Sequence, residues 1–188
     1  MNVWLEGFDK QLMVAGFRDV EIRDVNRFLQ AVKDKTGGVV VQFFDASLIA
    51  GVEHLRFAAL NALNAFKSKV NISDSLAMEI LLYASSQRQI KEAVMHLGIK
   101  PDIRSVVVLI LAETGSQVSS AMKVVDGLLV GRRDDSVLEL TEAKEAGLKK
   151  FFKISEAELE SKAVQKGEET RVLTDLIIEH LALLVTQR

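Results

Sequence analysis

Residues 103–112 read IRSVVVLILA, and this stretch decides the fold class. It is almost entirely Val, Leu and Ile, which is typical of a β-strand covered on both faces. Periodicity alone does not separate such a strand from a buried helix, so a helix remains the alternative. A second run, VVVQFF at residues 39–44, is β-branched and aromatic and also predicts a strand. The two runs predict the strands of a small sheet.

Outward from these runs, most of the chain has helical spacing of its apolar residues. Two short apolar runs within residues 3–17 predict a strand pair. A helix is expected between Asp24 and Thr36, and Arg132–Ser136 reads as a charged loop. Further helices are expected over residues 51–69, 74–85, 86–97, 116–131, 141–152, 155–164 and from 168 to the end. We therefore predict one α+β domain, residues 1–188, with a helix-rich layer packed on a small, mostly antiparallel sheet.

The composition, 48% apolar and 27% charged, is that of a globular protein. The sequence has no cysteine, which excludes disulfides, thiol catalysis and thiolate metal ligands. The N-terminus, MNVWLEGFDK, has no basic stretch followed by an apolar run, and no segment has the ~20 apolar residues of a membrane span. We expect a cytoplasmic protein without a signal peptide or a membrane partner.

Charge is unevenly distributed along the chain, although the net charge is only −2. The segment from Lys67 to Arg104 has six basic and four acidic residues, whereas the segment from Asp134 onward has eight basic and twelve acidic residues. A weakly basic patch of this kind could hold a few phosphates but could not coat a duplex.

No catalytic or cofactor motif is present. The sequence lacks G-x-G-x-x-G, G-x-x-x-x-G-K and G-x-S-x-G. His54, His96 and His180 lie on different predicted helices, so we expect surface or core-edge histidines rather than metal ligands. We therefore expect no catalytic residue, no metal and no cofactor.

Glu79 interrupts the apolar run MEILL at residues 78–82. A buried carboxylate is costly unless it is paired. We expect Glu79 to face solvent or to pair with Lys67 or Arg88, and a functional role is the alternative.

Residues 86–89, SQRQ, fit the capping box of a helix whose apolar set is Ile90, Ala93, Val94 and Leu97. The box accounts for Ser86 and Gln89 but not for Arg88, because a cation is disfavoured in the first turn of a helix. Exposed amides, the helix dipole and a guanidinium together could form a phosphate site. A plain exposed arginine is the alternative.

The stretch from Val39 to Ala112 resembles the PRPK-binding protein (TPRKB) family, the kinase-binding accessory subunit of the KEOPS/EKC complex, in its archaeal form. The most specific part is EILLYASSQRQI at residues 79–90, between VVVQFFDASLIAG and SVVVLILAE. The family pattern Ser-Gly-Gln-Arg-Gln-Ile falls on residues 85–90, where Ser86 replaces the glycine. The first 36 residues and the region after Gly131 match less well.

The resemblance implies a non-catalytic subunit of a complex that adds a threonylcarbamoyl group to the adenosine beside the anticodon in tRNA. Such a subunit binds the small Bud/PRPK-type kinase and helps to recruit tRNA through its single-stranded CCA end. Single-stranded RNA is held by a few phosphate contacts and by polar side chains. The candidate RNA-binding residues are Gln87, Arg88, Gln89, Lys91 and Lys67.

The last predicted helix is apolar nearly all round, so it must be buried on several sides or meet a partner. We expect its side formed by Leu176, His180 and Leu183 to contact the kinase, and burial within the domain is the alternative. Two other functions remain open: a small α+β metabolite enzyme with a pocket built from scattered residues, and a structural adaptor without RNA contact.

Overall fold

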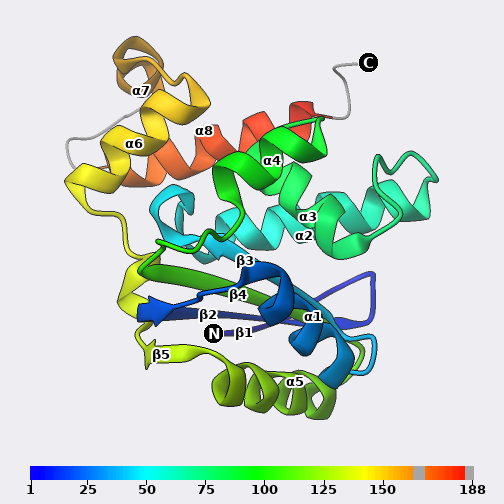
Figure 1. The fold of residues 1–188 in the computed structure, drawn as a ribbon. Coiled ribbons are helices and arrows are strands. Elements are labelled where there is room, and N and C mark those ends of the chain that lie inside the picture. Colours follow the sequence, from blue (N-terminus) through cyan, green and yellow to red (C-terminus); the bar gives the residue numbers. More distant parts are fainter. Residues whose placement is uncertain (163–167, 185–188) are drawn as a thin grey trace.

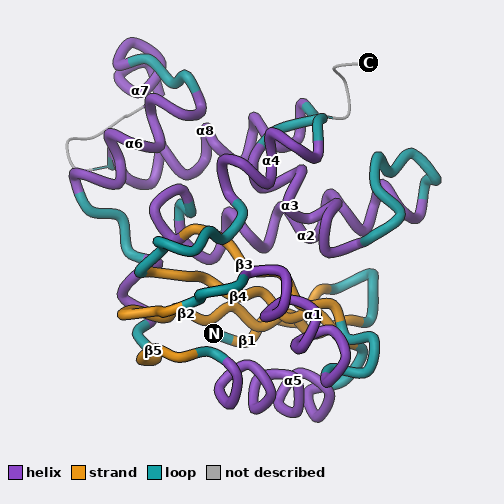
Figure 2. Tube along the Cα trace, in the orientation of Figure 1, coloured by secondary structure: helices purple, strands orange, loops and turns teal. Residues whose placement is uncertain are grey.

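The computed structural model describes residues 1–162 and 168–184. They form an antiparallel sheet with helices on both faces (Figure 1), and Figure 2 shows the strands gathered between two groups of helices. The strands are β1 (Asn2–Leu5), β2 (Lys10–Glu21), β3 (Val40–Asp45), β4 (Ser105–Ala112) and β5 (Val130–Arg133). The helices are α1 (Val25–Lys35), α2 (Gly51–Lys67), α3 (Leu76–Ser85), α4 (Ile90–Leu97), α5 (Gly115–Leu128), α6 (Glu142–Phe152), α7 (Glu156–Lys162) and α8 (Glu169–Leu183), with short 3₁₀ turns η1 (Ala46–Leu48) and η2 (Asp135–Leu138). The predicted α+β class is confirmed.

The stretch at residues 103–112 forms β4, an inner strand of the sheet. The strand order is β1-β2-β4-β3, and β5 pairs with the far end of β2. β2 and β4 run antiparallel from the pair Gln11 and Ala112 to the pair Arg18 and Ser105. Every residue of β4 after Ser105 is buried. The continuous apolar run is therefore a strand covered on both faces, and the helical alternative is wrong.

Alternate residues of β4 belong to two separate cores, as the period of a strand requires. Val107, Leu109 and Leu111 pack in the core beneath the large helical layer, formed by α2, α3, α4, α6, α7 and α8. Val106, Val108 and Ile110 pack against the small helical layer, formed by α1 and α5 on the other face. Neighbouring side chains of one strand thus stabilise opposite halves of the molecule.

Most predicted elements are observed, including the strand pair near the N-terminus and α1, whose N-cap Asp24 accepts from the Arg27 amide. The exception is β5, because α5 ends at Leu128 and residues 130–133 form a strand. All four residues of β5 are exposed, so the segment has no alternation of buried and exposed positions. Pairing with the end of β2, at Phe17 and Arg133, makes it a strand.

Glu79 is buried, contrary to the expectation that it faces solvent or pairs with Lys67 or Arg88. Its carboxylate accepts hydrogen bonds from the backbone N–H groups of Ile72, at 3.0 Å, and Ser73, at 2.8 Å. Hydrogen bonds to a charged acceptor offset the cost of burying it. Glu79 therefore holds the loop between α2 and α3 against the first turn of α3.

Candidate binding site at the junction of α3, α4 and α8

α3 ends in a left-handed residue, which turns the chain toward α4. Ser86 has φ 52° and ψ 35°, a conformation that favours glycine. The Ser86 N–H donates to the Tyr83 carbonyl and the Gln87 N–H donates to the Leu82 carbonyl, which is the Schellman pattern of a helix end. The glycine that the resembled family has at this position is the residue that such an end prefers.

The predicted capping box at residues 86–89 is wrong. Ser86 ends α3 instead of starting α4, and its hydroxyl donates to the His180 carbonyl of α8 at 3.0 Å. Gln89 is the N-cap of α4, and its side chain makes no capping hydrogen bond. The Ser86 hydroxyl thus ties the end of α3 to α8, across 94 residues of sequence.

Arg88 precedes α4 and is not in its first turn, so the predicted conflict with the α4 dipole does not arise. Its guanidinium Nη1 donates to the Leu184 carbonyl, at 3.4 Å, where α8 ends. A cation is favourable at the C-terminus of a helix, where carbonyls lack intrahelical donors. Arg88 is therefore explained as a side chain that caps α8, although the residue remains exposed.

The structure brings together four of the five predicted RNA-binding residues. Gln87, Arg88 and Gln89 form the turn between α3 and α4, and Lys91 is exposed in the first turn of α4. Because α4 has no side-chain cap, the dipole and amides of its first turn are not covered by a capping group. Lys67 lies apart, at the end of α2, with its ammonium 5.8 Å from the centre of the Phe8 ring.

Exposed apolar side chains lie on α4, which begins after this turn, and at the end of α8. Ile90 is 44% exposed, Val94 is 41% exposed, and Leu183, near the end of α8, is 51% exposed. Ile90 and Val94 are one turn apart on α4, and the Arg88–Leu184 hydrogen bond holds the start of α4 beside the end of α8. We call these three residues the α4–α8 apolar patch. Ile90 and Val94 were expected in the buried set of α4, but only Ala93 and Leu97 are buried.

The three residues predicted for the kinase contact differ in exposure. Leu176 is buried in the core beneath the large helical layer, so it is not available to a partner. His180 is half-buried, with its ring 6.5 Å from that of Phe152. Leu183 is exposed. Of these three residues, Leu183 is therefore the one most accessible to a partner.

His54 supports the junction from below. Its Nδ1 accepts from the Ala50 N–H at 3.0 Å, so its Nε2 carries the proton and donates to the Ala84 carbonyl at 2.8 Å. The ring is fully buried, and burial lowers its pKa from 6.5 to about 4. Neutral His54 thus joins the start of α2 to the end of α3, two residues before Ser86.

Residues 1–162 and 168–184 contain no group of three or more side chains placed to hold a metal ion. None of the helices in these ranges is long and apolar enough to cross a membrane. The three histidines lie on α2, α4 and α8, and His96 pairs with Glu92 on its own helix.

Comparison with known proteins identifies a family and a curated relative. The model of the family described as "Kinase binding protein CGI-121" matches residues 17–184. The curated "Regulatory protein Cgi121" of Methanocaldococcus jannaschii is 37% identical over 117 residues, which are 62% of this chain and 72% of that protein. The family match includes β4, the junction of α3, α4 and α8, and the α4–α8 apolar patch.

Proposed function

The chain belongs to the CGI-121 family of kinase-binding proteins, and from this premise we propose that it is a non-catalytic accessory subunit of the KEOPS tRNA-modification complex. In this role it binds the small Bud/PRPK-type kinase and helps to recruit tRNA through the single-stranded CCA end, for threonylcarbamoylation of the adenosine next to the anticodon. The observation that carries the proposal is the exposed α4–α8 apolar patch beside a polar, basic turn.

The α4–α8 apolar patch supports kinase docking on this corner. Ile90, Val94 and Leu183 are large apolar side chains with roughly half of their surface exposed. Clustered exposed apolar residues with a polar rim are typical of protein-binding surfaces. Arg88 and Lys91 supply part of that rim, and His180 lies one turn before Leu183 on α8.

Leu183→Glu tests the kinase contact, with Leu29→Glu as its matched control. Leu29 is 39% exposed on α1, in the small helical layer. We expect Leu183→Glu to raise the dissociation constant for the kinase at least tenfold, because the variant buries a carboxylate in an apolar interface. Leu29→Glu should bind as the wild type does. Equal affinity of the two folded variants, measured by calorimetry, would exclude this corner as the docking site.

The turn at residues 87–91 supports RNA binding. Gln87 and Gln89 offer amide donors and acceptors to base edges, and Lys91 lies where the α4 dipole favours an anion. Lys91 follows Ile90 by about 100° around the helix, so it faces to one side of the apolar patch. A kinase on the patch and a phosphate at Lys91 would therefore occupy adjacent faces of α4.

Binding of intact tRNA and of tRNA trimmed of its CCA end tests the RNA contact. We expect trimming and Lys91→Glu each to weaken binding several-fold in a gel-shift assay, because each removes part of a small electrostatic site. Lys123→Glu, with the same charge change on an exposed lysine of α5, is the control. Lys91 is a cleaner probe than Arg88, whose replacement by Glu would also place a carboxylate beside the Leu184 carbonyl. Equal binding of both tRNAs would leave a kinase-binding adaptor without RNA contact.

A further inference from the structure

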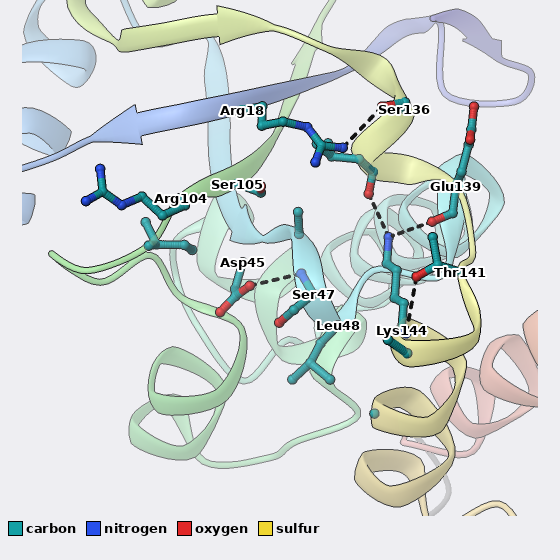
Figure 3. Close-up of a pocket in the computed structure, with 15 residues that line it drawn as sticks. Arg18, Asp45, Ser47, Leu48, Arg104, Ser105, Ser136, Glu139, Thr141 and Lys144 are labelled. Carbon is teal, nitrogen blue, oxygen red and sulfur yellow. Dashed lines mark hydrogen bonds between the residues drawn. The ribbon is translucent and has the colours of Figure 1, made fainter.

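A second site lies away from the junction, between the sheet and α6. A cavity of about 630 Å³ opens where β2, the start of β4, η1, η2 and α6 meet. Figure 3 shows Arg18, Asp45, Ser47 and Lys144 around it, whereas the Arg104 guanidinium points away from Lys144. None of its lining residues belongs to α3, α4 or α8. The cavity is therefore separate from the proposed kinase and RNA surfaces.

Lys144 carries a partly buried charge into this cavity. Its ammonium donates to the carbonyls of Val137, at 2.7 Å, and Glu139, at 3.4 Å, which are neutral acceptors. Within the described residues it forms no ion pair, although the Asp45 carboxylate is near enough to act on it. Burial lowers the Lys144 pKa from 10.5 to about 8. Since two bonds use two of the three ammonium donors, one N–H remains for a ligand.

The other walls of the cavity combine donors with an apolar floor. Arg18 donates to Asp134 at 3.1 Å and to Ser136 at 3.3 Å, which fixes its guanidinium at the rim. Leu48 and Val137 supply apolar surface beside Lys144. The Asp45 carboxylate accepts from the Ser47 N–H at 2.9 Å, so part of its charge is already satisfied. The cavity can therefore hold an anionic group at Lys144 and an apolar group on the floor.

We propose that this cavity binds a small organic anion, a phosphate ester or carboxylate with an apolar group, held at the Lys144 ammonium and the Arg18 rim. The two carbonyls around Lys144 are neutral, so the anion would supply the negative charge that balances the ammonium. Its apolar part covers Leu48 and Val137, in keeping with ligand sites that combine apolar walls with a few placed polar groups. The site does not depend on kinase or RNA binding.

Phenyl phosphate and inorganic phosphate are suitable probes of the full-length chain. We expect phenyl phosphate to bind at least tenfold more tightly than inorganic phosphate in calorimetric titration, because only the ester covers the floor. In limited acetylation at pH 8, read by peptide mass spectrometry, phenyl phosphate should protect Lys144 several-fold. Lys150, exposed on the same helix, should be unchanged. Bound anion shields the Lys144 amine and favours its unreactive charged form.

Ser47→Glu and Ser119→Glu form the matched pair of variants. Both serines are exposed, and Ser47 is at the cavity whereas Ser119 is on α5, beneath the sheet. We expect Ser47→Glu to weaken phenyl phosphate binding at least tenfold through like-charge repulsion, and Ser119→Glu to leave it unchanged. No saturable binding, equal affinity for the two probes, unprotected Lys144 or equal affinity of the two variants would each overturn the proposal. Circular dichroism of both variants excludes unfolding as the cause of a loss.

Discussion

The two faces of the sheet are covered in different ways. The small helical layer packs its cluster with apolar side chains, and α1 and α5 meet β2 and β4 without a buried charged or titratable group. The large helical layer buries His54, Glu79 and Ser85 and yet exposes Ile90, Val94 and Leu183. The large layer thus buries the titratable groups His54 and Glu79 and displays several large apolar groups, whereas α1 of the small layer displays Leu29.

In the proposed function, binding specificity resides in the large helical layer, and the burial of polar groups there supports this. Hydrogen-bonded polar groups in a core fix one arrangement of the elements around them. A buried polar group whose partner moves away is left without a hydrogen bond, and this destabilises the fold. His54, Glu79 and Ser86 fix the ends of α2, α3 and α8. Leu183 of the patch lies at the end of α8, and Ile90 and Val94 lie on α4, which follows the end of α3. The small layer supports the sheet, and in the proposed function the large layer also holds the α4–α8 apolar patch in shape for a partner.

The largest expected difference between the layers is in the response to acid. The folded pKa of His54, about 4, is below the unfolded value of 6.5, so the fold disfavours the protonated form. Its contribution is complete above pH 6.5 and is lost as the pH falls toward 4, which amounts to about 3 kcal/mol. Urea unfolding at steps from pH 7.5 to 4.5 measures this. His54→Gln, which cannot titrate, should flatten the slope in this window; an unchanged slope would show that other groups cause it.

A smaller loss is expected when the charge at Glu79 is removed. Glu79→Gln keeps the shape but weakens the hydrogen bonds to the Ile72 and Ser73 amides, so the free energy of unfolding should fall by about 2 kcal/mol. Hydrogen exchange should be faster at these two amides than in α5 of the small layer. Glu53→Gln, on the exposed part of α2, is the control and should change stability by less than about 0.5 kcal/mol. Similar losses in both variants would refute the role of Glu79.

The smallest expected effect is at Ser86, where two terms oppose each other. Ser86→Ala loses the hydrogen bond to the His180 carbonyl and keeps the left-handed conformation, so it should cost about 1 kcal/mol. Ser86→Gly loses the same bond but removes the strain of a side chain at positive φ, so its net effect should be near zero. Chemical denaturation of both variants measures the difference. A glycine variant as unstable as the alanine variant would show that backbone strain at Ser86 is negligible.

The α+β class and most elements could be predicted from the sequence because their apolar residues follow a clear period. The turn at residues 86–89 could not, since Ser-x-x-Gln is the pattern of a helix start. Ser86 adopts its left-handed conformation beside a carbonyl of α8, 94 residues away. The same limit applies to Arg88, whose acceptor belongs to Leu184. A local sequence pattern does not identify hydrogen-bond partners that are distant in the chain.

The exposure of the candidate residues also could not be predicted from the sequence. Ile90 and Val94 follow the same helical spacing as Ala93 and Leu97. Neighbouring elements cover the side of α4 that carries Ala93 and Leu97 and leave Ile90 and Val94 exposed. Leu176 and Leu183 are both leucines of α8, but Leu176 is buried and Leu183 is exposed. The cavity at Lys144 escaped prediction because it joins segments from β2, η1, η2 and α6, none of which carries a motif.

The pairing of β2 with β4 has a consequence for how the chain is made. The residues that pair, from Arg18 with Ser105 to Gln11 with Ala112, are separated by 87 to 101 positions along the chain. At roughly 5–20 residues per second, the ribosome needs on the order of ten seconds to deliver β4 after β2 has emerged. Until then the long edge of β2 has no strand to pair with, and closing so long a loop slows folding. The edge of β2 that pairs with β4 is thus unpaired during this interval, and an unpaired strand edge can pair with another chain.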